Sequence, residues 1–233
     1  MFIQIIQGKC QDADRMHQLT DEWREQLGPT AEGWLGGTYG ITDDNEFVGV
    51  VRFESREAAA RNSTRPEQGE WFTKMQECFD GDVMFHDCDN AQMFLNGGSD
   101  DAGFVQVMQG RLSDPERFRR FMDQPMDMLQ EQRPEIIGGT IAIDDDGFFT
   151  ETISFRSEEE ARVGEKKEMP EDRRREFEEE MSQVSDMRYL DLHSPWFASR
   201  MSGAGSGSGS GMVPGRGTTM GERPMGHGPL SRG

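Results

Sequence analysis

The chain has little of what many functions require. Of its 233 residues only three are cysteine, at Cys10, Cys78 and Cys88, no CxxC pair occurs, and no apolar run approaches membrane-spanning length. Sparse, unpaired cysteine is typical of a reducing compartment. The first residues also lack the basic segment and the apolar stretch of a secretion signal. We therefore expect a cytoplasmic protein with no membrane partner.

Basic charge is scarce as well. The chain has 25 Lys and Arg against 44 Asp and Glu, a formal net charge of −19, and no basic stripe interrupts the acidic surface. Such a surface repels a phosphate backbone, so we expect no nucleic-acid partner.

Metal-ligand sets are also missing from the sequence. His86 and Cys88 lie two apart on a predicted strand, but two ligands fall short of a zinc site. The acidic stretches Asp43-Asp44 and Asp144–Asp146 lack the other ligands of a calcium loop, so we interpret them as solvated hairpin tips. The sequence therefore predicts neither a metal nor a cofactor.

What the chain does have is an internal repeat. Residues 2–59 align without a gap with residues 104–161, at an offset of 104 − 2 = 102. Gln7 recurs as Gln109, and Gly36-Gly37-Thr38 recurs as Gly138-Gly139-Thr140. Two like units, each with an incomplete interface, can bury that interface against each other.

Each unit shows the pattern β-α-β-β-α-β, which is the ferredoxin-like split βαβ order. The first unit is predicted as strand 2–7, helix 12–27, strands 34–41 and 46–53, a helix capped by Ser55 and interrupted near Pro66, and strand 83–88. The second unit repeats this order and ends in a strand at 187–192. Pro125 is expected to kink or break its first helix.

The first strand carries apolar residues on both of its faces. Phe2 and Ile6 share one face, and Ile3 and Ile5 share the other. A sheet covered on one side only should alternate between apolar and polar residues. We therefore predict that one face meets the helices and the other meets the sheet of the second unit.

These features support a resemblance. With its duplicated unit and the strand-to-helix step Phe53-Glu54-Ser55, which recurs as Phe155-Arg156-Ser157, the chain resembles the dimeric α/β-barrel superfamily and its antibiotic-biosynthesis-monooxygenase-like branch. In its tandem form it is similar to a group of uncharacterised actinobacterial proteins. The resemblance implies an α+β fold in which two tandem ferredoxin-like units pack as an intramolecular dimeric α/β barrel.

The predicted organisation has four parts. Residues 1–95 form the first ferredoxin-like unit, 96–103 a linker, 104–198 the second unit, and 199–233 a disordered tail rich in Gly, Ser and Met. The protein is expected to be a monomer with an internal pseudo-dimer, or a higher oligomer.

Members of the resembling family include cofactor-free monooxygenases, haem-degrading enzymes and small-molecule isomerases. The haem-degrading members use Asn, Trp and His in the cleft between helices and sheet. Here Gln7 and Trp71 match the first two at best. No His lies on the second helix of either unit, which argues against haem degradation.

Five residues are candidates for lining a ligand pocket: Gln7, Trp34, Trp71, His86 and Gln109. The two amides end equivalent first strands, and either bind a ligand or satisfy backbone groups near Gly8 and Gly110. The two indoles either wall a cavity or fill the core. They align with Ile136 and Phe177, so unit one is the better pocket. His86 aligns with Leu190, which favours a barrel-lining position, and no catalytic residue is identified.

Two functions stay open. One is a small-molecule-binding protein, in its most specific form a cofactor-independent monooxygenase-like enzyme that holds a small aromatic or quinone-like ligand in a dry apolar pocket. The other is a non-catalytic binding or interaction module tethered through its tail. Residues 203–211 have the composition of a flexible linker, and residues 212–233 would then engage a protein partner. The ending 228–233 resembles peptides that load enzymes into encapsulin shells.

Overall fold

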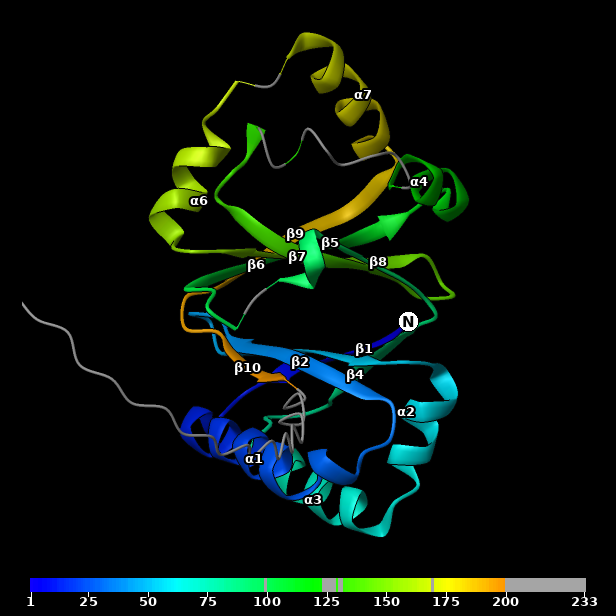
Figure 1. Ribbon diagram of the computed structural model, residues 1–233, viewed down its shortest axis with the longest axis vertical. Coiled ribbons are helices and arrows are strands. Elements are labelled where there is room, and N and C mark those ends of the chain that lie inside the picture. The colour runs from blue at the N-terminus through cyan, green and yellow to red at the C-terminus, as the bar shows by residue number, and fades with distance from the viewer. Residues whose placement is uncertain (99, 123–128, 130–131, 169, 200–233) are drawn as a thin grey trace, which may run out of the picture. The chain divides into compact units, whose positions relative to one another are not determined.

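The computed structural model describes residues 1–98, 100–122, 129, 132–168 and 170–199, all within one unit that spans Met1–Met201 (Figure 1). The predicted kink at Pro125 and the predicted tail from residue 200 onward lie outside the described residues.

The first half follows the predicted order. Its elements are β1 (Phe2–Lys9), α1 (Ala13–Gln26), the 3-10 turn η1 (Gly28–Thr30), β2 (Trp34–Ile41), β3 (Glu46–Phe53), α2 (Arg56–Ser63), α3 (Pro66–Gln76) and β4 (Met84–Cys88). The Ser55 hydroxyl accepts the backbone N–H of Ala58 and starts α2. Pro66 starts α3, where its missing N–H removes no helical hydrogen bond.

The second half repeats the unit. Its elements are β6 (Phe104–Leu112), α4 (Pro115–Met122), β7 (Ile136–Ile143), β8 (Phe148–Phe155), α6 (Glu158–Glu165), α7 (Glu171–Met181) and β9 (Val184–Leu192). Ser157 caps α6 by accepting the backbone N–H of Glu160, which reproduces the step at Ser55. The predicted tandem β-α-β-β-α-β fold is confirmed.

Two further strands were not predicted. They are β5 (Asn90–Phe94), which leads into the 3-10 turn η2 (Leu95–Gly97), and β10 (Trp196–Ser199). The sheets have the orders β10-β2-β3-β1-β4 and β5-β7-β8-β6-β9. Each sheet is therefore completed by a strand from the other half.

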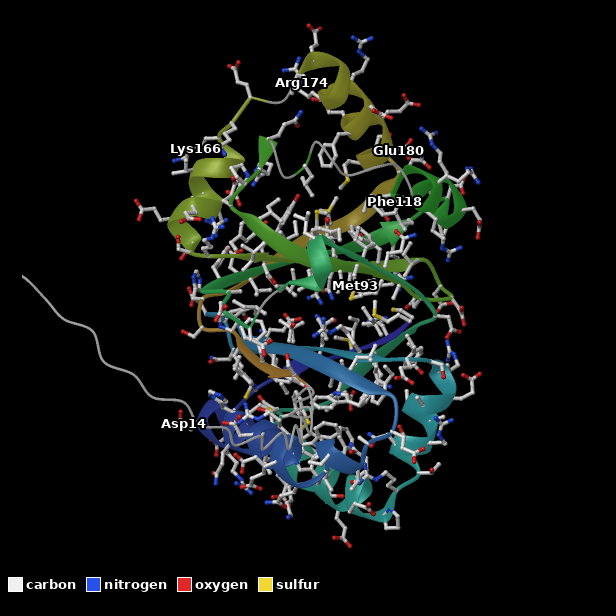
Figure 2. The ribbon with its side chains drawn as sticks, viewed as in Figure 1. Asp14, Met93, Phe118, Lys166, Arg174 and Glu180 are labelled. Atoms are coloured by element: carbon white, nitrogen blue, oxygen red, sulfur yellow. The ribbon has the colours of Figure 1, made fainter. Side chains whose placement is uncertain are left out.

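The two sheets face each other across a shared core. Ile3 and Ile5 of β1 pack in one buried cluster with Val105 and Val107 of β6. The helices lie on the outer faces of the sheets, as Figure 1 shows for α1 and α3. On the outer side of the second sheet, Phe118 of α4 is buried (Figure 2), with its ring centroid 5.4 Å from that of Phe149. The prediction that both faces of the first strand are covered is confirmed.

Candidate functional site

The two candidate amides meet each other in the space between the sheets. Gln7 Nε2 donates to Gln109 Oε1, and Gln109 Nε2 donates to Gln7 Oε1, with a donor–acceptor distance of 3.1 Å in each bond. Both residues are 0% exposed. Gln109 also donates to Thr150 Oγ1 at 3.1 Å and accepts from Arg188 Nε at 2.9 Å. Arg188 forms an ion pair with Glu46 at 3.0 Å. The amides thus join the halves, and among the described residues they satisfy each other instead of backbone groups near their strand ends.

The candidate indoles lie on the helix side of the first sheet, together with a third indole, Trp23 of α1. Trp34 is 2% exposed and meets Trp23 edge-on, with 4.8 Å between ring centroids. Trp23 and Trp71 are 6.3 Å apart. Trp23 Nε1 donates to Gln68 Oε1 at 2.6 Å and Trp71 Nε1 donates to the Leu19 carbonyl at 2.8 Å.

Trp34 differs from the other two indoles in one respect. Its Nε1–H is buried and has no hydrogen-bond partner within the part of the chain that the structure describes. A buried donor without an acceptor costs about 1–3 kcal/mol, so such groups are rare. The first half therefore keeps one donor unused among aromatic rings.

The second half does not reproduce this cluster. Ile136 stands in place of Trp34, as expected. Helices α3 and α7 start 171 − 66 = 105 residues apart and end 181 − 76 = 105 apart, so the equivalent of Trp71 is Glu176. Phe177, which the sequence alignment paired with Trp71, is 41% exposed. The alignment failed there because the connections before the two helices differ in length.

His86 lies apart from the indoles, on the edge strand β4. Its Nδ1 is 2.9 Å from Asp144 Oδ2, and its ring stacks on Phe148 with 4.1 Å between centroids. Both partners belong to the β7–β8 hairpin, so His86 forms a contact between the first half and the second. The neighbouring Cys88 is buried, and burial raises the pKa of its thiol to about 12, which makes it a poor nucleophile.

One carboxyl was missed by the sequence analysis. Glu151 of β8 lies on the helix side of the second sheet, where its strand neighbours Phe149 and Ile153 join the apolar cluster of that half. Burial raises the pKa of Glu151 to about 7. The signal was present in the alternation Phe149-x-Glu151-x-Ile153, which puts a charge on an otherwise apolar strand face.

The described ranges contain neither a metal-ligand cluster nor a membrane-spanning helix. There, no three His, Cys, Asp or Glu side chains gather as a metal site. No described helix combines the length and the apolar character of a membrane span.

The chain thus has the architecture of a tandem ferredoxin-like α/β barrel. Among solved structures it is similar to a candidate monooxygenase from Lactobacillus acidophilus, with a TM-score of 0.65, 13% identity, and coverage of 85% of this chain and 95% of that one. A candidate monooxygenase from Fusobacterium nucleatum matches with a TM-score of 0.63 and 8% identity, covering 85% and 94% of the two chains.

An anthrone oxidase-like protein also matches, with a TM-score of 0.63, 10% identity, and coverage of 85% and 92%. No family model matches the chain, and no curated protein is similar to it in sequence. At these identities the likeness shows that the chain shares the fold of these proteins, and it leaves the reaction open.

Proposed function

We propose that the protein binds a small aromatic or quinone-like molecule between the helices and the sheet of its first half, as a cofactor-independent monooxygenase-like enzyme. The observation that carries this proposal is the buried Trp34 Nε1–H without a partner, set among the rings of Trp23 and Trp71. The names of the similar structures, two candidate monooxygenases and an anthrone oxidase-like protein, support the reaction class.

The arrangement suits a flat ligand that carries a carbonyl group. Aromatic walls supply apolar contact area, and few polar groups are needed to orient a small molecule in such a site. The free indole N–H would donate to the ligand oxygen, which removes the cost of leaving that donor unpaired. A ligand that reacts with O₂ by itself needs little more than a dry, oriented setting.

The test compares ligands that differ in the acceptor. Thermal-shift and fluorescence titrations would use anthrone, polycyclic phenols, quinones and haem, with anthracene as the ring system that lacks an acceptor. We expect anthrone to stabilise the protein. Trp34→Phe should weaken anthrone binding about 2- to 10-fold, the worth of one hydrogen bond, and leave anthracene binding unchanged.

Trp71→Phe is the matched control. It also removes one indole N–H, but that donor is already bound to the Leu19 carbonyl. It should therefore lower stability without changing the preference for anthrone over anthracene. The proposal fails if no ligand raises the melting temperature, or if Trp34→Phe weakens the binding of both ring systems equally.

A further inference from the structure

The second half carries a carboxyl where the first half has none. Glu151 corresponds to Gly49 at the repeat offset of 151 − 49 = 102. In the first half this place is filled by aromatic rings, since a Cβ on Gly49 would lie 3.2 Å from both Tyr39 Cδ1 and Phe47 Cε1. The equivalent of Tyr39 is Ile141, whose shorter side chain leaves room for Glu151.

The surroundings of Glu151 are apolar on every side that the sheet defines. It is paired with Met108 on β6 and with Ile141 on β7, which are 8% and 4% exposed. Along its own strand, the next side chains on the same face are Phe149 and Ile153. No hydrogen-bond or ion-pair partner of Glu151 lies within the described ranges of the chain.

Such a placement works against stability. A carboxylate without a partner in apolar surroundings is costly, and an aliphatic residue would serve the fold better. Desolvation holds the pKa of this carboxyl near 7, so it gains and loses its proton near neutral pH. Glu151 is half-buried, and carboxyl groups with a perturbed pKa gather at functional sites.

A second polar group stands in the same row of the sheet. Tyr189 on β9 is paired with Met108, and Met108 is paired with Glu151, so the three side chains cross the helix side of the sheet in line. Tyr189 is 59% exposed. Two strand spacings separate it from Glu151, about 10 Å between Cα atoms, a span that matches the length of one or two fused rings along this row.

We propose that Glu151 is the proton acceptor of a second ligand site on the helix side of the second sheet. The ligand class is a small planar phenol or enol, lying on Met108 with the Tyr189 ring at its outer edge. In the step, the ligand O–H bond breaks, its electron pair stays on the ligand oxygen, and the proton forms an O–H bond with the Glu151 carboxylate. The product is a bound ligand anion beside a neutral acid, and no oxidant or metal enters.

The two partners are matched for this transfer. A base whose pKa lies near that of a weakly acidic phenol exchanges a proton with it at little cost in either direction. In apolar surroundings, an anion beside a neutral carboxyl acid keeps a short charge-assisted hydrogen bond. This site is separate from the one proposed in the first half, so either can exist without the other.

The experiment uses 4-nitrophenol, whose anion absorbs at a longer wavelength than the phenol, and 4-nitroanisole, which has no proton to give. Absorbance is recorded with excess protein at pH 7, where about half of Glu151 is a carboxylate, and free ligand at the same pH is the reference. We expect the ligand to show a stronger anion band with wild type than it does free in solution. In Glu151→Gln this gain should be lost, while 4-nitroanisole binds both proteins equally.

Glu159→Gln is the matched control, because it removes the same charge from an exposed position on α6 and should keep the anion band. Thermal melting of each variant checks folding, and Glu151→Gln should melt no lower than wild type, since it replaces an isolated acid by a neutral amide. An anion band of equal strength in Glu151→Gln overturns the proposal, and so does the absence of nitrophenol binding to wild type. Loss of the Trp34 effect on anthrone would instead overturn the proposed function alone.

Discussion

The reciprocal amide pair predicts an unequal cost for two symmetry-related substitutions. In Gln7→Leu the two bonds of 3.1 Å between the amides are lost, but Gln109 keeps its donor bond to Thr150 and its acceptor bond from Arg188. The nitrogen and the oxygen of the Gln109 amide each keep one partner, so the expected loss is about 1–2 kcal/mol, the net worth of two buried hydrogen bonds.

Gln109→Leu has a larger effect. It leaves the 0% exposed amide of Gln7 without a partner in the described part of the chain, and it removes the acceptor of Arg188 Nε. Unmade buried hydrogen bonds cost about 1–3 kcal/mol for each group, so the expected loss is about 3–4 kcal/mol. The double leucine variant removes the stranded amide too, and should recover about 1–2 kcal/mol of that loss.

Urea unfolding followed by circular dichroism and by fluorescence gives the four free energies of this double-mutant cycle, and coincidence of the two probes checks two-state behaviour. Equal m-values would show that the denatured state is unchanged. The reasoning is refuted if Gln7→Leu costs as much as Gln109→Leu, or if the two losses add within about 0.5 kcal/mol, the limit of additivity for independent sites.

Three further predictions concern stability. The folded-state pKa of Glu151 is about 7 against an ordinary 4.5. The contribution of Glu151 to the free energy of unfolding is fully present below pH 4.5 and is lost as the pH rises through 7. In wild type the free energy of unfolding should therefore fall by about 3 kcal/mol at most over this range, and Glu151→Leu should remove that fall. Urea unfolding from pH 5 to 8 measures the difference. Gly69→Ala should raise stability by about 0.5–1 kcal/mol, because a Cβ there meets nothing within 4 Å on α3; a loss would contradict the open space. By contrast, Gly139→Ala would press its Cβ into the Thr152 carbonyl and the Phe94 ring, and should cost more than about 3 kcal/mol, with a matching fall in melting temperature.

The sequence was sufficient for the fold because its signals were local and repeated. Apolar residues on both faces of residues 2–7 required a second layer, and the repeat supplied it. The exchanged strands β5 and β10 could not be predicted from the sequence, because they are short edge strands whose pairing depends on a partner far along the chain. Trp196–Ser199 shows no alternation of apolar and polar residues that would predict a strand. It is a strand because it pairs with Gly36–Tyr39.

The site was less accessible to sequence reasoning. The pairing of Gln7 with Gln109 depends on how the two sheets face each other, which residue spacing within either unit cannot define. The three indoles differ in their hydrogen bonding: Trp23 and Trp71 each donate one hydrogen bond, and Trp34 donates none within the described residues. Glu151 was overlooked because a charge in a strand is ordinarily assigned to the solvent face.

The exchange of β5 and β10 has an evolutionary consequence. Two separate copies of one half would have to complete each other's sheets, so every change in sequence would appear at both symmetry-related places. Here a single chain holds both halves at high effective concentration and lets each change alone. A costly acid can then enter one copy while its twin keeps a glycine. Because both halves lie in one chain, their sequences can differ at equivalent positions, as they do at Gly49 and Glu151.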